Sequence, residues 1–282
     1  MTENKFWIWD ETFPSLRLKG DGAAAFLHGQ TTADVFSQKE TETNFLSCWL
    51  STKGTLKALL EIHFSNDMAE IVIISGDITS IRDGFESVIF PADKVRLEVV
   101  RSIRRRQKIN NFNSWKNETS TWIDDNGLIE KENSIYQKAT KSELEIWKKR
   151  QGIPGFGKEI NGTSNPYELG LGDIINLDKG CYLGQEAMAR FCRSKSFKYQ
   201  LRYWESYGNS NHLDIGNKFI NTNQDQGLTK KVGFITSLIR GDNDCFKGLA
   251  LIKTNFLDKD FCFSEGGDSI TIKKPISFTE PF

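Results

Sequence analysis

A dense group of chemically special residues occupies the segment 178–190, which reads DKGCYLGQEAMAR. A cation, two glycines and a thiol stand close together, and a carboxylate follows. Gly180 and Gly184 permit a positive φ or a close approach of the backbone to a ligand. Cys181 stands beside Lys179, and a neighbouring cation favours the reactive thiolate form of a cysteine. The segment therefore predicts a tight loop with a functional thiol, and Cys181 is the candidate catalytic residue.

A helix is expected to begin near Gly184 and to run through Glu186 to Arg190. Its N-terminus would supply free N–H donors and the positive end of the helix dipole. Glu186 and Arg190 lie four residues apart, so both point to one side and can pair with each other or bracket a polar ligand. Two plainer readings stay open: an ordinary exposed ion pair, and an inert Cys181 that acts as a small hydrophobic residue.

Other kinds of catalytic site lack their motifs in this chain. There is no GxxxxGK[ST], no GxGxxG after a strand and no GxSxG, which disfavours nucleotide-binding loops and a marked serine nucleophile. The histidines His28, His63 and His212 form no HExxH, and the five cysteines form no CxxC. We therefore expect no metal site and no disulfide framework, which favours a reducing compartment.

Composition places the chain among ordinary globular proteins. Its 282 residues are 38% hydrophobic, enough for two or three packed units, and 37 basic residues balance 37 acidic ones. A net charge of zero gives no general reason to bind nucleic acid or an anionic membrane. No apolar run is long enough to span a bilayer, and the first residues resemble no targeting segment. We expect a cytoplasmic monomer.

The elements that must position the loop follow a hairpin, strand, helix, strand order. Strands are expected at 15–19, 44–50, 56–64, 69–74 and 95–99, with a turn at 52–54 between the second and third. Asp21 is expected to cap a short helix, and Asp77 a second one. Ser142 and Glu145 form the pattern of a capping box for a third helix, which Gly152 ends. This order is typical of an α+β fold.

From Phe197 the pattern changes to short runs separated by Gly, Asn and Asp turns. These runs are 200–204, 218–220, 232–238, 248–252, 261–263 and 269–272. They predict a small β-barrel or sandwich at the C-terminal end.

A basic run stands out at 101–108, with Arg101, Arg104, Arg105, Arg106 and Lys108. It is either a solvated strand end or a patch for an anion or a partner protein.

The residues Lys179 to Glu186, KGCYLGQE, match the KGCYxGQE signature of the YgfZ-type folate-binding proteins. That family is related to the glycine-cleavage T-protein, an aminomethyltransferase, and takes part in iron–sulfur cluster assembly or repair. Other segments are similar to the family as well. They are 18–21, 26–35, 51–56, 150–154 and 232–237, with Glu159, Pro166 and Glu168.

The resemblance implies a T-protein-like ring of domains around a channel for tetrahydrofolate. It divides the chain into a discontinuous folate-binding domain (1–43 plus 135–196), a second α+β domain (44–134) and a C-terminal β-barrel (197–282). It also places the cofactor-binding residues near the folate. These are Lys179, Gly180, Tyr182, Gly184, Gln185, Glu186 and Arg190. Glu186 would accept the pterin N–H groups, and Arg190 or the basic run would meet the glutamate tail.

The same resemblance argues against aminomethyl transfer. A T-protein uses a carboxylate in a Gly-x-x-Asp-Asp hairpin segment, and the corresponding stretch here is 54–58, GTLKA. A cation, Lys57, and a methyl group, Ala58, stand where the acids would be. The expected function is a tetrahydrofolate-binding accessory protein that supports iron–sulfur clusters in client enzymes. The alternatives are a folate-dependent aminomethyltransferase and a non-catalytic scaffold.

Overall fold

A computed structural model describes residues 6–124, 137–195, 197–207, 213–223, 228–241, 245–258 and 260–280. The chain separates into two compact units. The first comprises Met1–Ala139, Gly155–Pro166 and Asp173–Arg193, and the second comprises Thr140–Pro154, Tyr167–Gly172 and Ser194–Phe282. The three-part division that the resemblance implies stays a prediction.

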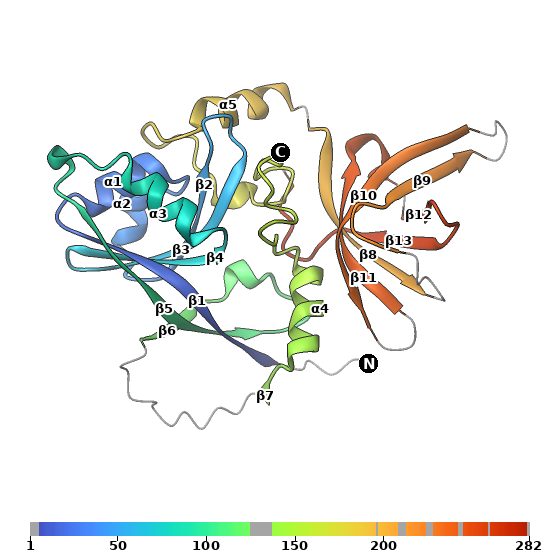
Figure 1. The fold of residues 1–282 in the computed structure, drawn as a ribbon, viewed down its shortest axis with the longest axis horizontal. Helices are drawn as coiled ribbons and strands as arrows, with labels where there is room; N and C mark the ends of the chain where they lie inside the picture. The colour runs from blue at the N-terminus through green and yellow to red at the C-terminus, as the bar shows by residue number, and fades with distance from the viewer. Residues whose placement is uncertain are drawn as a thin grey trace. The chain divides into compact units, whose positions relative to one another are not determined.

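One mixed sheet forms the body of the first unit (Figure 1). Its strands are β1 (Trp7–Lys19), β2 (Phe45–Leu50), β3 (Leu56–Ser65), β4 (Met68–Ser75), β5 (Arg96–Ile109), β6 (Ser120–Asp124) and β7 (Gln137–Lys138). The spatial order is β2-β3-β4-β1-β5-β6 with antiparallel pairing, and β7 joins the start of β1 in parallel. The predicted hairpin at 52–54 connects β2 to β3, and the expected strands of this part are present.

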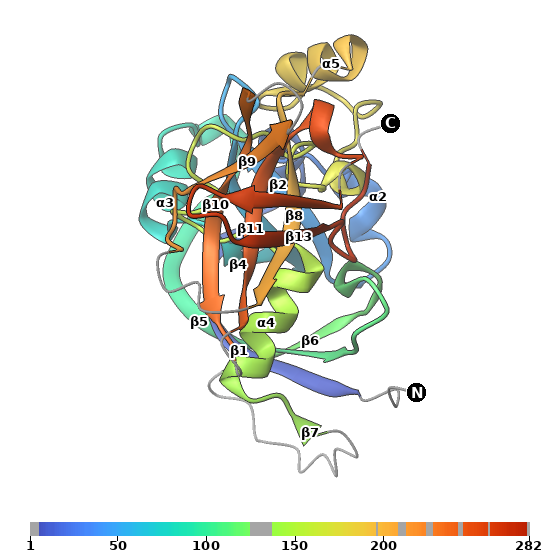
Figure 2. The same cartoon turned by 90° about the vertical axis from the view of Figure 1, so that its right-hand side faces the viewer.

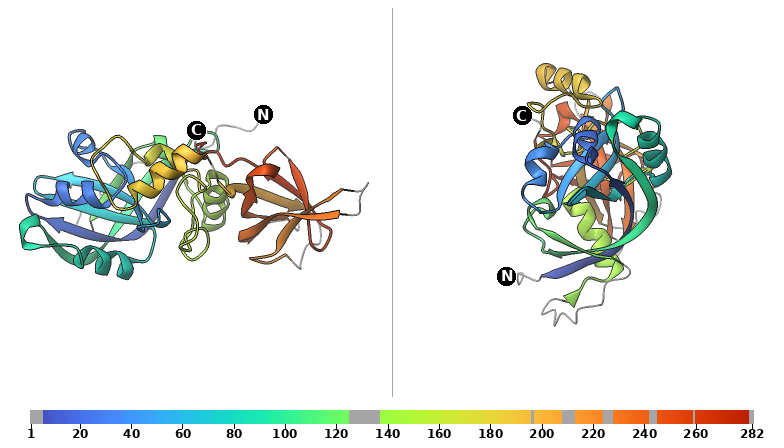
Figure 3. Two further views of the ribbon diagram at one scale, coloured as in Figure 1. Left: turned by 90° about the horizontal axis from the view of Figure 1, so that it is seen from above. Right: turned by 90° about the vertical axis from the view of Figure 1, so that its left-hand side faces the viewer.

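Three helices, α1 (Ala23–Gln30), α2 (Val35–Lys39) and α3 (Ile78–Glu86), accompany this sheet (Figure 3). Leu16 and Leu18 of β1 pack in one hydrophobic core with residues of α1 and α3. Because successive side chains of a strand point to opposite faces, Ser15 and Arg17 lie on the other face. That second face is the one that carries polar groups, and it holds the cavities described below.

Two helix starts differ from the expected ones. The N-cap of α1 is Gly22 and not Asp21. Residue 22 must be a glycine, because a Cβ there would lie 1.6 Å from the carbonyl oxygen of Asp93. The capping box of α4 (Lys141–Gln151) is Thr140 with Glu143, two residues earlier than the predicted Ser142 with Glu145. The prediction at Asp77 is confirmed, since its carboxylate accepts the backbone N–H of Ser80 at 2.8 Å.

The second unit is built on a closed barrel with the order β10-β11-β8-β13-β12-β9 (Figure 2). The strands are β8 (Tyr199–Tyr207), β9 (Lys218–Asn223), β10 (Leu228–Arg240), β11 (Cys245–Lys253), β12 (Phe261–Ser264) and β13 (Ser269–Lys273). This confirms the predicted C-terminal barrel. Helix α4 lies against β11 and ends at Gly152, whose φ of 78° favours glycine.

The remaining elements are α5 (Gln185–Ser194) and four short 3-10 turns. The turns are η1 (Pro91–Asp93), η2 (Trp115–Asn117), η3 (Gly172–Ile174) and η4 (Thr254–Phe256). Among the helices of the described residues, none is long and apolar enough to cross a membrane.

The basic run lies inside β5 and not at a strand end. Arg104 binds both carboxylate oxygens of Asp10, at 2.7 and 2.6 Å, and Arg105 binds the buried Glu61. Much of the run is therefore engaged in ion pairs that tie β5 to the adjacent β1 and, across the face of the sheet, to β3.

Candidate functional site

Lys179 ties the signature loop to the turn between α1 and α2. Its ammonium group donates to the backbone carbonyls of His28, Thr31 and Ala33, at 2.5, 2.7 and 2.8 Å. Burial lowers the pKa of Lys179 to about 8, while the negative charge of Asp34 acts in the opposite direction. All three N–H bonds of the ammonium have an acceptor, so Lys179 is a positioning residue for the loop.

Gly184 packs against the β2–β3 hairpin, and Gln185 makes hydrogen bonds within the loop segment. Gly184 has a φ of 84°, and a Cβ there would lie 2.6 Å from the carbonyl oxygen of Ser51. Glycine is therefore required where the loop meets the hairpin after β2. The Gln185 amide nitrogen donates to the carbonyls of Leu177 and Lys179, at 3.1 and 3.3 Å. Gly180 passes beside the His28 ring, where a Cβ would lie 3.4 Å from Nε2.

The thiol and the two charged helix residues face outward. Cys181 is the only exposed cysteine of the five, all of which lie within the described residues. Glu186 and Arg190 are exposed on α5, which begins one residue after the predicted start. Within the described residues no ion pair joins them. Tyr182 is buried, with the Lys179 ammonium 4.7 Å from its ring centre.

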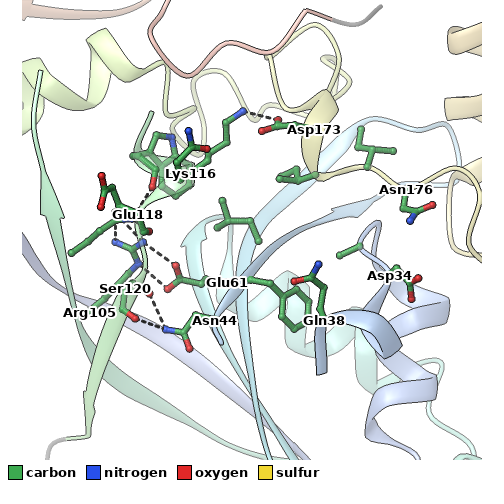
Figure 4. Close-up of a pocket in the computed structure, with 18 of the residues that line it drawn as sticks. Asp34, Gln38, Asn44, Glu61, Arg105, Lys116, Glu118, Ser120, Asp173 and Asn176 are labelled. Atoms are coloured by element: carbon green, nitrogen blue, oxygen red, sulfur yellow. Dashed lines mark hydrogen bonds and ion pairs between the residues drawn. The ribbon is translucent and has the colours of Figure 1, made fainter. Parts of the chain in front are cut away.

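A polar cavity of about 580 Å³ opens on the second face of the sheet in the first unit (Figure 4). Its floor comes from β2, β3 and β5, and its walls from the start of α2, from η2 and from the segment before the signature. The lining residues are Ala33, Asp34, Gln38, 44–46, Glu61, Arg105, Gln107, 115–118, Ser120 and 173–178.

A buried ion pair forms part of the floor. Arg105 donates through Nε and NH2 to the two carboxylate oxygens of Glu61, each at 2.8 Å, and the Trp122 indole donates to the same carboxylate at 2.7 Å. Arg105 also donates to the side-chain oxygen of Gln107 at 3.2 Å. Such a two-bond pair holds both charges in fixed positions.

A second ion pair links two walls of the cavity. The ammonium of Lys116, in η2, lies 2.6 Å from the carboxylate of Asp173. Only 5% of the Lys116 side chain is exposed, and burial lowers its pKa while the charge of Asp173 raises it.

Two further groups offer polar atoms to a ligand. Asp34 caps α2, and the Ser37 hydroxyl at 2.9 Å holds the pKa of Asp34 below its ordinary value, so it is ionised near neutral pH. The side-chain oxygen of Asn176 accepts the backbone N–H groups of Asp178 and Lys179, at 2.8 and 2.9 Å. This arrangement leaves the Asn176 Nδ2 group as a donor at the cavity wall.

None of the predicted site residues of the signature segment 179–190 lines the cavity, although that segment approaches it; Arg105 of the predicted basic run does line it. Asn176, Leu177 and Asp178, directly before the signature, form part of its wall. Sequence reasoning missed Asp34, Glu61 and Lys116. One signal was available: Glu61 is a lone charge within the apolar run 59–64, which is typical of a buried charge with a partner.

The chain was compared with known proteins at the level of sequence and of structure. No family model matches the sequence, and no curated protein matches it either. The fold resembles an aminomethyltransferase. The solved structure is the glycine cleavage system aminomethyltransferase T from Bartonella henselae, with a TM-score of 0.72 and 12% identity over 99% of this chain and 88% of that chain. This likeness confirms the expected T-protein-like fold with its C-terminal barrel.

Proposed function

We propose that the chain binds a reduced folate, tetrahydrofolate or a relative, in the polar cavity of the first unit. The observation that carries the proposal is the bond from Lys179 to Ala33, which joins the signature loop to a residue of the cavity wall. The T-protein-like fold and the KGCYxGQE match both favour a folate as the ligand.

The cavity has the size and the groups that a folate needs. Its volume of about 580 Å³ lies within the range of roughly 300–1,000 Å³ that is usual for small-molecule sites. The ionised Asp34 can accept the N–H groups of a pterin ring, and the Nδ2 group of Asn176 can donate to its carbonyl oxygen. A bound reduced folate supplies one-carbon chemistry, while these residues bind and orient it.

Aminomethyl transfer is disfavoured by the residues of the β2–β3 hairpin. Ala58 is fully buried on the helix side of the sheet, where a Cβ at Gly76 would lie 2.7 Å from its methyl group. The ammonium of Lys57 lies 4.0 Å from the centre of the Trp49 ring. These two positions thus present no carboxylate to the cavity. We therefore propose an accessory role in the assembly or repair of iron–sulfur clusters, with client or assembly proteins as partners.

Cys181 is the candidate functional thiol of that role. It is exposed, and it lies two residues after Lys179, whose ammonium group binds the carbonyl of Ala33 in the cavity wall. A single cysteine cannot hold a cluster, which needs four protein ligands, so the thiol would react or make brief contact with a cluster or partner.

Anaerobic calorimetry with tetrahydrofolate tests the ligand. We expect saturable binding that weakens about tenfold in Asp34→Asn, as the loss of one charged hydrogen bond would give. Asp83→Asn is the matched control, because Asp83 is an exposed acid on α3. Glu186→Ala tests the role that the resemblance gives to Glu186. Absence of binding by the folded protein would contradict the proposal and favour the scaffold alternative.

Complementation tests the thiol. In a strain that lacks the protein, Cys181→Ser should fold normally and fail to restore iron–sulfur enzyme activities. Cys192→Ser is the matched control, since Cys192 is a partly exposed cysteine of α5. Full rescue by Cys181→Ser would remove the thiol from the mechanism.

A further inference from the structure

A second cavity lies on the same face of the sheet, beyond the Glu61–Arg105 pair. It has a volume of about 250 Å³, and its lining includes Arg17, His63, Arg101 and Trp122. His63 stands two residues after Glu61 in β3, so both side chains point to the face that carries the first cavity. The two cavities are therefore neighbours on one polar surface of one unit.

The charges of this second cavity favour an anion. Two arginines and a histidine face one acid, Glu70. Glu70 accepts hydrogen bonds from the Ser15 hydroxyl and from Nε of Arg17, both at 2.7 Å, so its charge is compensated within the protein. Within the described residues, Nε is the only side-chain nitrogen of Arg17 with a hydrogen-bond partner. Its two NH2 groups remain as donors, and a guanidinium binds carboxylates through such paired donors.

A histidine nitrogen also lacks a partner here. Nδ1 of His63 is buried and makes no hydrogen bond to any described residue. The His63 ring meets the Trp122 ring edge-on, with the centres 5.9 Å apart, and the indole is held by its bond to Glu61. Buried polar atoms are nearly always hydrogen-bonded, so an orphaned one beside a cavity indicates a missing partner.

We propose that this second cavity binds a carboxylate group on a short aliphatic chain. Arg17 would take the carboxylate, and Met68, Ile103 and the Trp122 ring would cover the chain. Two sources carry this chemistry. One is a free dicarboxylate of the size of glutarate. The other is the glutamate end of a folate whose pterin lies in the first cavity, and this source rests on the proposed function.

The Trp122 indole N–H is a local reporter of this cavity. Its NMR signal is assigned by its loss in Trp122→Phe, in protein labelled with ¹⁵N tryptophan. The probes are glutarate, its uncharged analogue glutaramide, tetrahydrofolate and tetrahydropteroate, which lacks the glutamate. We expect a saturable shift with glutarate or tetrahydrofolate, no shift with glutaramide, and an affinity about tenfold weaker in Arg17→Gln.

A control arginine and a second substitution at Arg17 complete the test. Arg96→Gln is the matched control, because Arg96 is an arginine of β5 whose side chain is 69% exposed. If Arg17→Gln does not fold, Arg17→Lys keeps the charge, loses the paired donors and should also weaken binding.

Every result of this titration either supports or overturns the proposed carboxylate site. A shift with glutarate supports a free dicarboxylate, and a shift with tetrahydrofolate that tetrahydropteroate does not give supports the tail of a folate. The inference is overturned if no probe gives a saturable shift, if glutaramide matches glutarate, or if Arg17→Gln binds like the wild type. Calorimetry that shows no folate binding removes the folate source alone, and the glutarate arm still decides the site.

Discussion

The ammonium group of Lys179 donates a hydrogen bond to the backbone carbonyl oxygen of Ala33, 2.8 Å away, across 146 residues of sequence. Ala33 lines the polar cavity, and Lys179 is the first residue of the signature. Any shift of the loop that carries Cys181 must therefore stretch a bond to the cavity wall. The loop and the cavity are expected to respond together to a ligand.

Lys179→Met should lower the free energy of unfolding by about 3 kcal/mol, because it leaves three buried carbonyls without a donor. Urea unfolding measures this loss. Lys53→Met is the control, since Lys53 is exposed in the β2–β3 turn and should change stability by less than about 0.5 kcal/mol. Equal stability of the two variants would contradict the positioning role of Lys179.

Gly184→Ala should destabilise the protein more than Gly216→Ala. Both glycines have a positive φ, 84° and 90°, so both alanines carry the backbone strain of about 1 kcal/mol. Only the alanine at 184 also meets the Ser51 carbonyl, because nothing lies within 4 Å of a Cβ at Gly216. Thermal unfolding of the two variants measures the difference. If Gly184→Ala were the more stable variant, the close contact between loop and hairpin would be refuted.

Glu61→Gln should cost about 3–5 kcal/mol, because it leaves the charge of Arg105 buried without a counterion. Arg105→Met in the same protein should recover a large part of that loss, since the unpaired charge is then gone. Denaturant unfolding of the single and double variants gives the coupling between the two residues. Additive losses would show that the pair does not act as a unit.

The stability of the first unit should depend on acid through Asp10. Its hydrogen bonds from Arg104 are the largest cause that holds the pKa of Asp10 below 3.8. A carboxyl with a lowered folded pKa stabilises the fold above its unfolded value and loses that contribution as the pH falls through the folded value. The stability difference between wild type and Asp10→Asn should therefore be full at pH 7 and shrink below pH 3.8. A constant difference over that range would contradict the assignment.

The regular elements were predictable because each depends on local pattern. The alternation in 15–19 and 69–74 and the short runs after Phe197 are properties of neighbouring residues, and the structure forms strands there. Helix starts were less predictable: α1 begins after Gly22, which packs against the backbone of Asp93, a residue distant in sequence. No local pattern reports such a fit.

Of the candidate site, the sequence predicted the signature loop and not the cavity beside it. The density of special residues at 178–190 identified the loop, and Gly184 has the positive φ that its type allows. The cavity combines six separate stretches, from Ala33 to Asp178, that only sheet order and loop packing bring together. The partnership of Glu61 with Arg105 depends on β3 and β5 sharing one face, which spacing along the chain does not encode.

Odd-numbered positions on β1, β3 and β5 supply Arg17, Glu61 and Arg105 to the polar face, while even-numbered ones such as Leu16, Leu18 and Leu60 fill the helix-side core. Substitution at an odd position outside the buried Glu61–Arg105 pair thus changes the polar face and leaves the helix-side core intact. A single residue inserted into β3 before Glu61 would exchange the two roles for every later position of the strand, turning Glu61 toward the core. The chemistry of the polar face outside that pair can therefore change by point mutation, whereas the length of β3 is constrained by both faces at once.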